Sequence, residues 1–199
     1  MRHNKSETMT DQHAIIRDAL PSDAPFLAQC ILAGFHLYDF EPEGPKDKEV
    51  YRLLIECIKR DDLLYTYKFA RMAEVGGVPA GALLSYPGEL YRGLRHKTFV
   101  ELWPDLLRLD AESEQETGPG EFYLDSLAVS PAFRHQGIGH TLIEDGIRKG
   151  IDLGYKQMGL VADVTMPHLI RLYSSYGFVP EERRKVLGIN FQRMVYTVR

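Results

Sequence analysis

The chain has 199 residues, of which 44% are hydrophobic and 26% charged, and its formal net charge is -4. These values predict one globular domain that is long enough to bury a core. The acidic balance leaves no excess of basic side chains for a nucleic-acid-binding face, so we expect no nucleic-acid partner. No apolar run reaches membrane-spanning length, and we expect no membrane partner.

The two cysteines, Cys30 and Cys57, lie far apart and show no metal-binding spacing. We expect two buried free thiols in a reducing compartment, and no metal site. Residues 1–12 are polar and lack the apolar core of a signal peptide. They are expected to form a flexible leader before one domain at 13–199, in a cytoplasmic protein.

The first half of the chain predicts a strand, two helices and a hairpin. Ser22 is the expected cap of the first helix, and Gly76-Gly77 supply the tight turn of the hairpin. The predicted elements are a strand at Ala14–Arg17, a helix from Pro21, a loop at Asp39–Pro45, a helix around Val50–Ile58, and strands at Tyr65–Val75 and Val78–Tyr86.

The region from Pro87 to Gly120 has the least regular pattern. A short helix is predicted at Phe99–Leu109, within an insertion or mobile loop that separates two strands. A lid over an acceptor site is the alternative interpretation of this region.

The second half alternates strands and helices more clearly. Together with the first half it predicts one α/β domain, a mixed central sheet with helices on both faces. The closing strand has alternating apolar residues and pairs either across a homodimer or within one chain. The elements are a strand at Glu121–Val129, a helix ending near Leu153, a strand at Lys156–Val161, a helix at Pro167–Tyr176, and strands around Phe178–Lys185 and Ile189–Val198.

The strand–turn–helix unit from Leu124 to Gly146 carries the clearest chemical signal. A helix that opens at Gly137 and Gly139 exposes free N–H groups and partial positive charge, which suits a pyrophosphate. A glycine turn without a ligand is the plain alternative. A dinucleotide fits less well, because Leu142 stands where the dinucleotide fingerprint requires a third glycine.

Two segments at these positions resemble the GNAT superfamily of N-acetyltransferases. The segment YLDSLAVSPAFRHQGIGHTLIEDGI, with R-x-x-G-x-G from Arg134, looks like the central signature of that family. The segment HLIRLYSSYGFVP is similar to its later motif, in which a helix carrying Leu-Tyr stops at Gly-Phe. The resemblance is firm over Glu121–Pro180 and looser over Ala14–Tyr86, where only the order of elements agrees.

The resemblance implies an acyl-CoA N-acyltransferase fold and direct transfer of an acetyl group from acetyl-CoA to an amine. It implies a sheet that splays after the central strand, with the pantetheine of CoA in the gap. The backbone of Leu127, Ala128 and Val129 is then expected to pair with the pantetheine. The pyrophosphate is expected at the turn formed by Arg134, His135, Gln136, Gly137, Ile138, Gly139 and His140. The family usually has an Asn where Met166 stands here, which puts one cofactor contact in doubt.

Tyr173 matches the tyrosine that acts as general acid in the family. Its spacing with Leu169, Leu172 and Tyr176 is also that of a buried helix stripe. A general base, where one is used, is expected on the central strand. Asp125 is the nearer candidate and Glu121 the other, because strict alternation places both on the face of Leu127 and Val129.

The acceptor is expected to bind near the first two helices and the Tyr86–Gly120 region. Aromatic and acidic side chains there suit a cationic amine, although a core position or a solvated loop explains them equally well. These candidates are His36, Tyr38, Asp39, Glu41, Glu43, Tyr86, Tyr91 and Trp103. The predicted function is an N-acetyltransferase acting on a primary amine of a small molecule or peptide. The alternatives are a non-catalytic acyl-CoA sensor of the same fold and a nucleotide-binding oxidoreductase.

Overall fold

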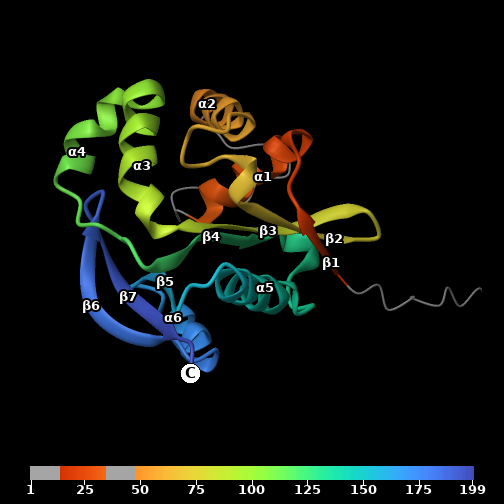
Figure 1. The fold of residues 1–199 in the computed structure, drawn as a ribbon. Coiled ribbons are helices and arrows are strands. Elements are labelled where there is room, and N and C mark those ends of the chain that lie inside the picture. The colour runs from red at the N-terminus through yellow and green to blue at the C-terminus, as the bar shows by residue number, and fades with distance from the viewer. Residues whose placement is uncertain (1–13, 35–47) are drawn as a thin grey trace, which may run out of the picture.

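Seven strands form one mixed sheet in the order β1-β2-β3-β4-β5-β7-β6, in a computed structural model that describes residues 14–34 and 48–199 (Figure 1). All neighbouring strands are antiparallel except β4 and β5. The strands are β1 Ile15–Asp18, β2 Ala70–Val75, β3 Val78–Pro87, β4 Glu121–Val129, β5 Gln157–Asp163, β6 Val179–Val186 and β7 Ile189–Thr197.

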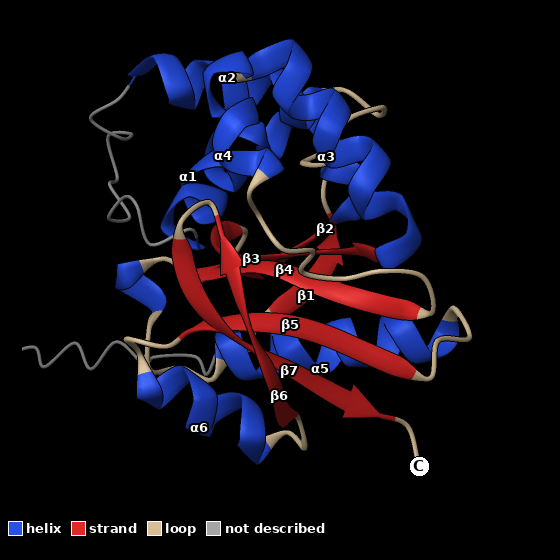
Figure 2. Ribbon diagram, turned by 90° about the vertical axis from the view of Figure 1, so that its left-hand side faces the viewer, coloured by secondary structure: helices blue, strands red, loops and turns tan. Residues whose placement is uncertain are grey.

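Helices cover both faces of this sheet, as the sequence predicted. Figures 1 and 2 show α1–α4 on one face and α5 and α6 on the other. The helices are α1 Ala24–Gly34, α2 Lys48–Lys59, α3 Gly88–Leu102, α4 Leu107–Ala111, α5 Ile138–Asp152 and α6 Pro167–Ser175. The predictions for residues 1–12, His36, Tyr38 and Asp39–Pro45 lie outside the described residues.

The sheet separates two apolar cores. Side chains of α1 and α2, among them Leu27, Ile31 and Leu54, pack with β2–β4 on one face. On the opposite face, Leu142 and Ile143 of α5 pack against the sheet. Both cysteines are buried free thiols, as predicted. Among the described residues, no helix combines the length and apolar character needed to cross a bilayer.

Two glycines allow α5 to lie close to the sheet. A Cβ at Gly146 would lie 2.5 Å from Leu83 Cδ2, and one at Gly150 would lie 2.8 Å from Met158 Cε. Both distances are shorter than carbon–carbon contacts allow, so any larger residue must push the helix or these side chains away. Because α5 begins at the predicted anion-binding turn, these glycines also fix the height of that turn above the sheet.

The region between β3 and β4 is helical rather than a loop, which corrects the prediction. α3 runs over Gly88–Leu102, whereas the expected helix began only at Phe99. The buried face of α3 mixes polar and aromatic side chains, namely Tyr91, Arg95, Thr98 and Phe99, so the apolar periodicity that marks most helices is weak. The polar members of this face lead to the site described below.

The start of the first helical segment is also corrected. Ser22 is not the cap; instead Asp23 Oδ2 accepts a hydrogen bond of 2.7 Å from the backbone N–H of Leu20. The same carboxylate pairs with Arg17 at 2.7 Å. The strand predicted to begin at Tyr65 begins at Ala70, because Tyr67–Phe69 forms a short 3-10 turn.

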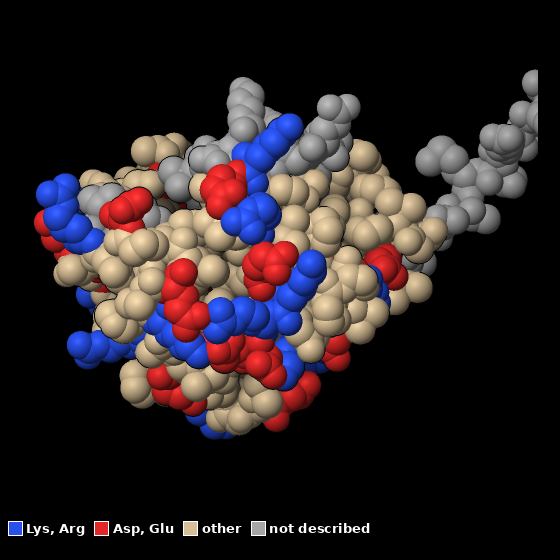
Figure 3. Space-filling view, turned by 90° about the horizontal axis from the view of Figure 1, so that it is seen from above, with Lys and Arg blue, Asp and Glu red and all other residues tan. Residues whose placement is uncertain are grey.

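Ion pairs connect the segment that follows α2 to α3. Arg60 bonds Glu101 at 2.6 Å and Asp62 at 2.8 Å, and Lys97 also pairs with Asp62. On the face shown in Figure 3, basic and acidic side chains of the described residues alternate over these helices. These pairs hold α3 against the helical layer.

The close approach of α5 predicts opposite effects for two alanine substitutions. Gly146→Ala overpacks against Leu83 and should lower the unfolding free energy by about 1–3 kcal/mol. Gly93→Ala, on the exposed side of α3 where a Cβ meets nothing within 4 Å, should raise it by up to about 1 kcal/mol. Urea unfolding of both variants measures this, and equal effects would contradict the packing explanation.

Candidate active site

β4 and β5 separate soon after they begin. They pair at only three positions, Glu121 with Gln157, Phe122 with Met158 and Tyr123 with Gly159. Beyond these positions β4 stays paired to β3 and β5 stays paired to β7. The splayed sheet expected from the resemblance is therefore confirmed. One backbone edge of the second half of β4 lacks a neighbouring strand, because β5 no longer pairs with it.

A β-bulge interrupts β4 where Asp125 stands. Leu84 of β3 faces Ser126 and Ser85 faces Leu124, which leaves Asp125 as an extra residue without an opposite partner. Such a bulge turns a side chain away from strict alternation. The prediction that Asp125 and Leu127 share one face is therefore wrong. Leu127 packs with the α5 core, whereas the carboxylate of Asp125 accepts a hydrogen bond from Tyr86 on the α1 side.

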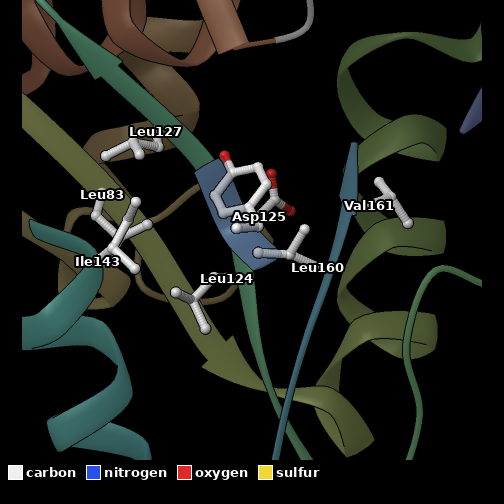
Figure 4. A pocket seen from close by; sticks show the side chains of 8 residues that line it. Leu83, Leu124, Asp125, Leu127, Ile143, Leu160 and Val161 are labelled. Atoms are coloured by element: carbon white, nitrogen blue, oxygen red, sulfur yellow. The ribbon is translucent and has the colours of Figure 1, made fainter. Parts of the chain in front are cut away.

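A small cavity lies where the two strands part. Its free volume is ≈ 20 Å³, which is room for about one water molecule. Figure 4 shows Asp125 between Leu83, Leu124 and Ile143 on one side and Leu160 and Val161 on the other. Leu127 and Tyr173 complete the lining. The structure thus places both predicted catalytic residues, Asp125 from β4 and Tyr173 from α6, around one space.

The carboxylate of Asp125 has a raised proton affinity. Burial and the nearby carboxylate of Glu116 raise the pKa of Asp125 to about 6, against the lowering effect of hydrogen bonds from Tyr86 and Ser126. Ser126 Oγ donates to Asp125 Oδ1 at 2.7 Å. Within residues 14–34 and 48–199, no cation forms an ion pair with Asp125, and β4 lies inside the sheet between β3 and β5. An acid with this pKa is ionised at pH 7 and still accepts a proton readily.

Tyr173 is half-buried on α6, and its ring meets Phe178 edge-on at 6.1 Å between centroids. Burial raises the pKa of Tyr173 to about 12. The phenol therefore keeps its proton throughout the neutral and mildly alkaline range and can donate it into the cavity. Tyr173 packs against the core, as the helix stripe predicted, and it also lines the cavity.

Glu121, the other candidate base, is bonded to residues outside the cavity. Its carboxylate pairs with Arg193 of β7 and accepts a hydrogen bond of 3.0 Å from Thr117 Oγ1. The side chain is 12% exposed and lies beside the paired part of β4 and β5. The structure therefore gives Glu121 a structural position and leaves Asp125 as the carboxylate of the cavity.

The predicted pyrophosphate turn has the backbone that an anion site needs. His135 and Gly137 have φ of 63° and 78°, and α5 starts at Ile138 immediately after Gly137. The first N–H groups of a helix have no partner within it. His135, Gln136 and His140 are exposed, whereas the side chain of Ile138 is buried, so Ile138 can contribute its backbone alone.

Gly139 is not required by the fold, in contrast to Gly137. A Cβ at Gly137 would be strained by the positive φ, which explains that glycine by conformation alone. Gly139 lies in the first turn of α5, where a Cβ would meet only Val129 Cγ2 at an ordinary 3.7 Å. A glycine at this place leaves the turn open to close approach by a ligand. Arg134 lies at the rim, where its Nε donates to the carbonyl of Val129 at 3.3 Å.

Met166 stands at the cap of α6 and makes no side-chain capping bond. Pro167 occupies the first turn, as the sequence predicted, and the backbone N–H of Met166 donates to the carbonyl of Asp163 at 3.0 Å. The side chain of Met166 cannot give the polar contact expected from an Asn at this position.

Sequence reasoning missed a buried polar cluster beside Asp125. Glu116 accepts hydrogen bonds from Tyr91 and Tyr123, both at 2.7 Å, and from Arg95 at 2.9 Å. Tyr86 and Tyr91, named as acceptor-side candidates, belong to this region, while Trp103 packs edge-on against aromatic rings. Glu116 lies in the Pro87–Gly120 region, which was expected to be an insertion or mobile loop, and no local pattern distinguished it. No group of His, Cys, Asp or Glu among the described residues is arranged to hold a metal ion.

Comparisons with known proteins agree with this geometry. The family model described as "Acetyltransferase (GNAT) family" matches residues 31–178. An N-acetyltransferase from Staphylococcus aureus Mu50 has a TM-score of 0.75 and 19% identity, over 91% of this chain and 99% of that one. A solved acetyltransferase has a TM-score of 0.73 and 27% identity, over 93% and 100%. A search of curated proteins found no match.

A mixed sheet that splays between its two parallel strands, beside a helix opening on a glycine turn, defines an acyltransferase fold of the acyl-CoA-using type. The chain belongs to the acetyltransferase (GNAT) family, as the family model shows, and is an acyltransferase. The oxidoreductase alternative is thereby excluded.

The two glycines of the turn predict different stabilities for the unliganded protein. Gly137→Ala must adopt a left-handed conformation and should cost about 1–2 kcal/mol of unfolding free energy. Gly139→Ala adds a helix-favouring residue in ordinary contact and should be neutral or stabilising by up to about 1 kcal/mol. Urea denaturation separates them, and a large loss with Gly139→Ala would mean that the fold itself needs this glycine.

Proposed function

We propose that this protein transfers an acetyl group from acetyl-CoA directly to a primary amine of a small molecule or peptide. The observation that carries the proposal is that Asp125 and Tyr173 line one cavity where β4 leaves β5. A side chain that accepts a proton and one that donates a proton are thus on two elements around the same space. The family supplies acetyl transfer as the reaction, and the acceptor class is our inference.

The residues present fit acetyl-CoA on two structural grounds. The free backbone edge of β4 over Leu127, Ala128 and Val129 can pair with the amide groups of the pantetheine, in the manner of an added strand. The first-turn N–H groups of α5, opened by Gly139, can hold the pyrophosphate, with Arg134 at the rim. Bound acetyl-CoA supplies the acetyl group as a thioester.

Each catalytic candidate has a role that follows from its proton affinity. An amine attacks only in its neutral form, and Asp125, with a pKa of about 6, can take the proton that the amine must lose. Tyr173 keeps its proton at neutral pH and lines the same cavity, which supports a role as proton donor to the departing thiolate. Both side chains are held by packing, so neither needs to move into place.

The sequence also allowed a non-catalytic acyl-CoA sensor, which the assignment to the acetyltransferase (GNAT) family does not support. Met166 in place of the usual Asn favours it, because one polar cofactor contact is missing. The paired placement of Asp125 and Tyr173 argues against it, since a sensor needs neither a base nor an acid in the gap.

A cytoplasmic location is part of the proposal, supported by two buried cysteines that form no disulfide. A homodimer, if formed, would not use the strand first considered. β7 is paired on both edges within the chain, to β5 and to β6, and the edge strand at this end of the sheet is β6. Pro180 and the charged side chains of β6 make that edge a poor surface for strand pairing.

Binding of acetyl-CoA should raise the melting temperature of the wild-type protein in a concentration-dependent way. A ligand present at 100 times its Kd stabilises by about 2.7 kcal/mol. Gly139→Ala should fold as well as the wild type yet lose most of the shift, because its Cβ occupies the approach to the turn. Gly93→Ala is the matched control and should keep the full shift. An NADH-induced shift without an acetyl-CoA shift would contradict the assignment.

Release of free CoA thiol in the presence of an amine panel tests catalysis. The wild-type kcat/KM should fall below about pH 6 as Asp125 becomes protonated, and Asp125→Asn should remove this limb with a loss of about 10²–10⁴-fold. Tyr173→Phe should lower kcat by a similar factor while leaving acetyl-CoA binding intact. Binding without any amine-dependent thiol release would favour the sensor.

A further inference from the structure

We propose that Glu116, on the segment between α4 and β4, is a positioning residue that keeps Asp125 ready to accept a proton. The inference rests on the proposed function, since it concerns the candidate base of that site. Glu116 lies in the helical insertion that follows β3, so this role would belong to the insertion rather than to the core sheet.

Glu116 is fixed by three donors. Tyr91 and Tyr123 each donate a hydroxyl hydrogen bond of 2.7 Å, and Arg95 Nη1 donates at 2.9 Å. Its side chain is only 12% exposed. Because Glu116 is largely shielded from solvent, little water screens the interaction of its carboxylate with neighbouring acids.

Two adjacent tyrosine rings, tilted by 53° to each other, connect Glu116 to Asp125. The rings of Tyr86 and Tyr123 lie 5.7 Å apart between centroids. Tyr123 donates to Glu116, and Tyr86 donates to Asp125. The carboxylates of Glu116 and Asp125 are therefore bonded to two neighbouring tyrosines. Among the described residues, no cation bonds both carboxylates.

Among the described residues, the guanidinium of Arg95 is the only one in this layer, and it bonds two other carboxylates instead of Asp125. Arg95 bonds Asp110 at 2.5 Å and Glu116 at 2.9 Å, and its guanidinium lies over the rings of Tyr91 and Phe99. Its positive charge is thus largely compensated by two carboxylates. Removal of the Glu116 charge would also free Arg95 to act on Asp125, so both consequences point the same way.

All elements packed against Asp125 contribute to this balance. Burial and the charge of Glu116 raise the pKa of Asp125, while the hydrogen bonds of Tyr86 and Ser126 and the charge of Arg95 lower it. Tyr65 is buried near the same group, and Tyr173 faces it across the cavity. Because burial raises the pKa of these phenols and keeps them neutral at pH 7, the Glu116 carboxylate is the nearby group that opposes a negative charge at Asp125.

The test follows the carboxyl carbon of Asp125 directly by 13C NMR titration of the unliganded protein. Asp125→Asn identifies the signal by its loss. In Glu116→Gln the midpoint should fall by about half a pH unit or more, because the opposing charge is removed. Glu112→Gln, an exposed glutamate on the same segment, is the matched control and should leave the midpoint unchanged. An unchanged midpoint in Glu116→Gln would overturn the proposal.

Tyr86→Phe supplies a second variant with the opposite sign. It removes a hydrogen bond that favours the ionised form of Asp125 but preserves the ring packing, so the midpoint should rise. A fall in the midpoint with this variant would contradict the network described here, even if Glu116→Gln failed to fold.

The pH dependence of thiol release gives the functional readout. The acid limb of kcat/KM should move with the NMR midpoint, lower in Glu116→Gln and higher in Tyr86→Phe, whereas a merely structural effect would change kcat/KM at all pH values alike. NMR shifts without any amine-dependent activity in the wild type would leave Glu116 in this role and refute the proposed function instead. If neither the acid limb of kcat/KM nor the NMR midpoint of Asp125 moves in Glu116→Gln, the role proposed for Glu116 is refuted.

Discussion

The parting of β4 from β5 after three paired positions is the constraint on which the rest of the structure depends. It leaves the backbone edge of Leu127–Val129 available and opens the cavity that Asp125 and Tyr173 share. The same parallel pair requires a crossover, and that crossover is α5, whose first turn faces the gap. The free edge of β4, the start of α5 and the cavity that Asp125 and Tyr173 line therefore all depend on where β4 and β5 stop pairing.

The bulge at Asp125 and the α3–α4 insertion complete the site from the other face of the sheet. Tyr123 and Asp125 alternate normally and share the face of Tyr86, and the bulge then places Leu127 on the opposite face, in the α5 core. Gly88 makes the insertion possible, because a Cβ there would lie 2.2 Å from the carbonyl of Gly118. The insertion then returns to β4 carrying Glu116, and its ion pairs with the end of α2 hold it in place.

The sequence predicted the fold and the glycine turn before α5, because both depend on local signals. R-x-x-G-x-G after a strand and Leu-Tyr before Gly-Phe are read directly from neighbouring residues. The polar cluster beside Asp125 was less predictable, because it depends on contacts distant in sequence: Tyr86 with Asp125, and Tyr91 with Glu116. A bulge of one residue is invisible to periodicity, and α3 was hidden because polar side chains such as Arg95 occupy its buried face.

Amide hydrogen exchange with and without acetyl-CoA is the most direct test of the account, because it reports which backbone groups the ligand covers. If acetyl-CoA binds along β4 and the first turn of α5, it should slow exchange in peptides covering Leu127–Val129 and His135–His140. Exchange in the β1–β2 pair should stay unchanged. Protection elsewhere, with β4 and the first turn of α5 unaffected, would contradict the claim that the gap between β4 and β5 holds acetyl-CoA.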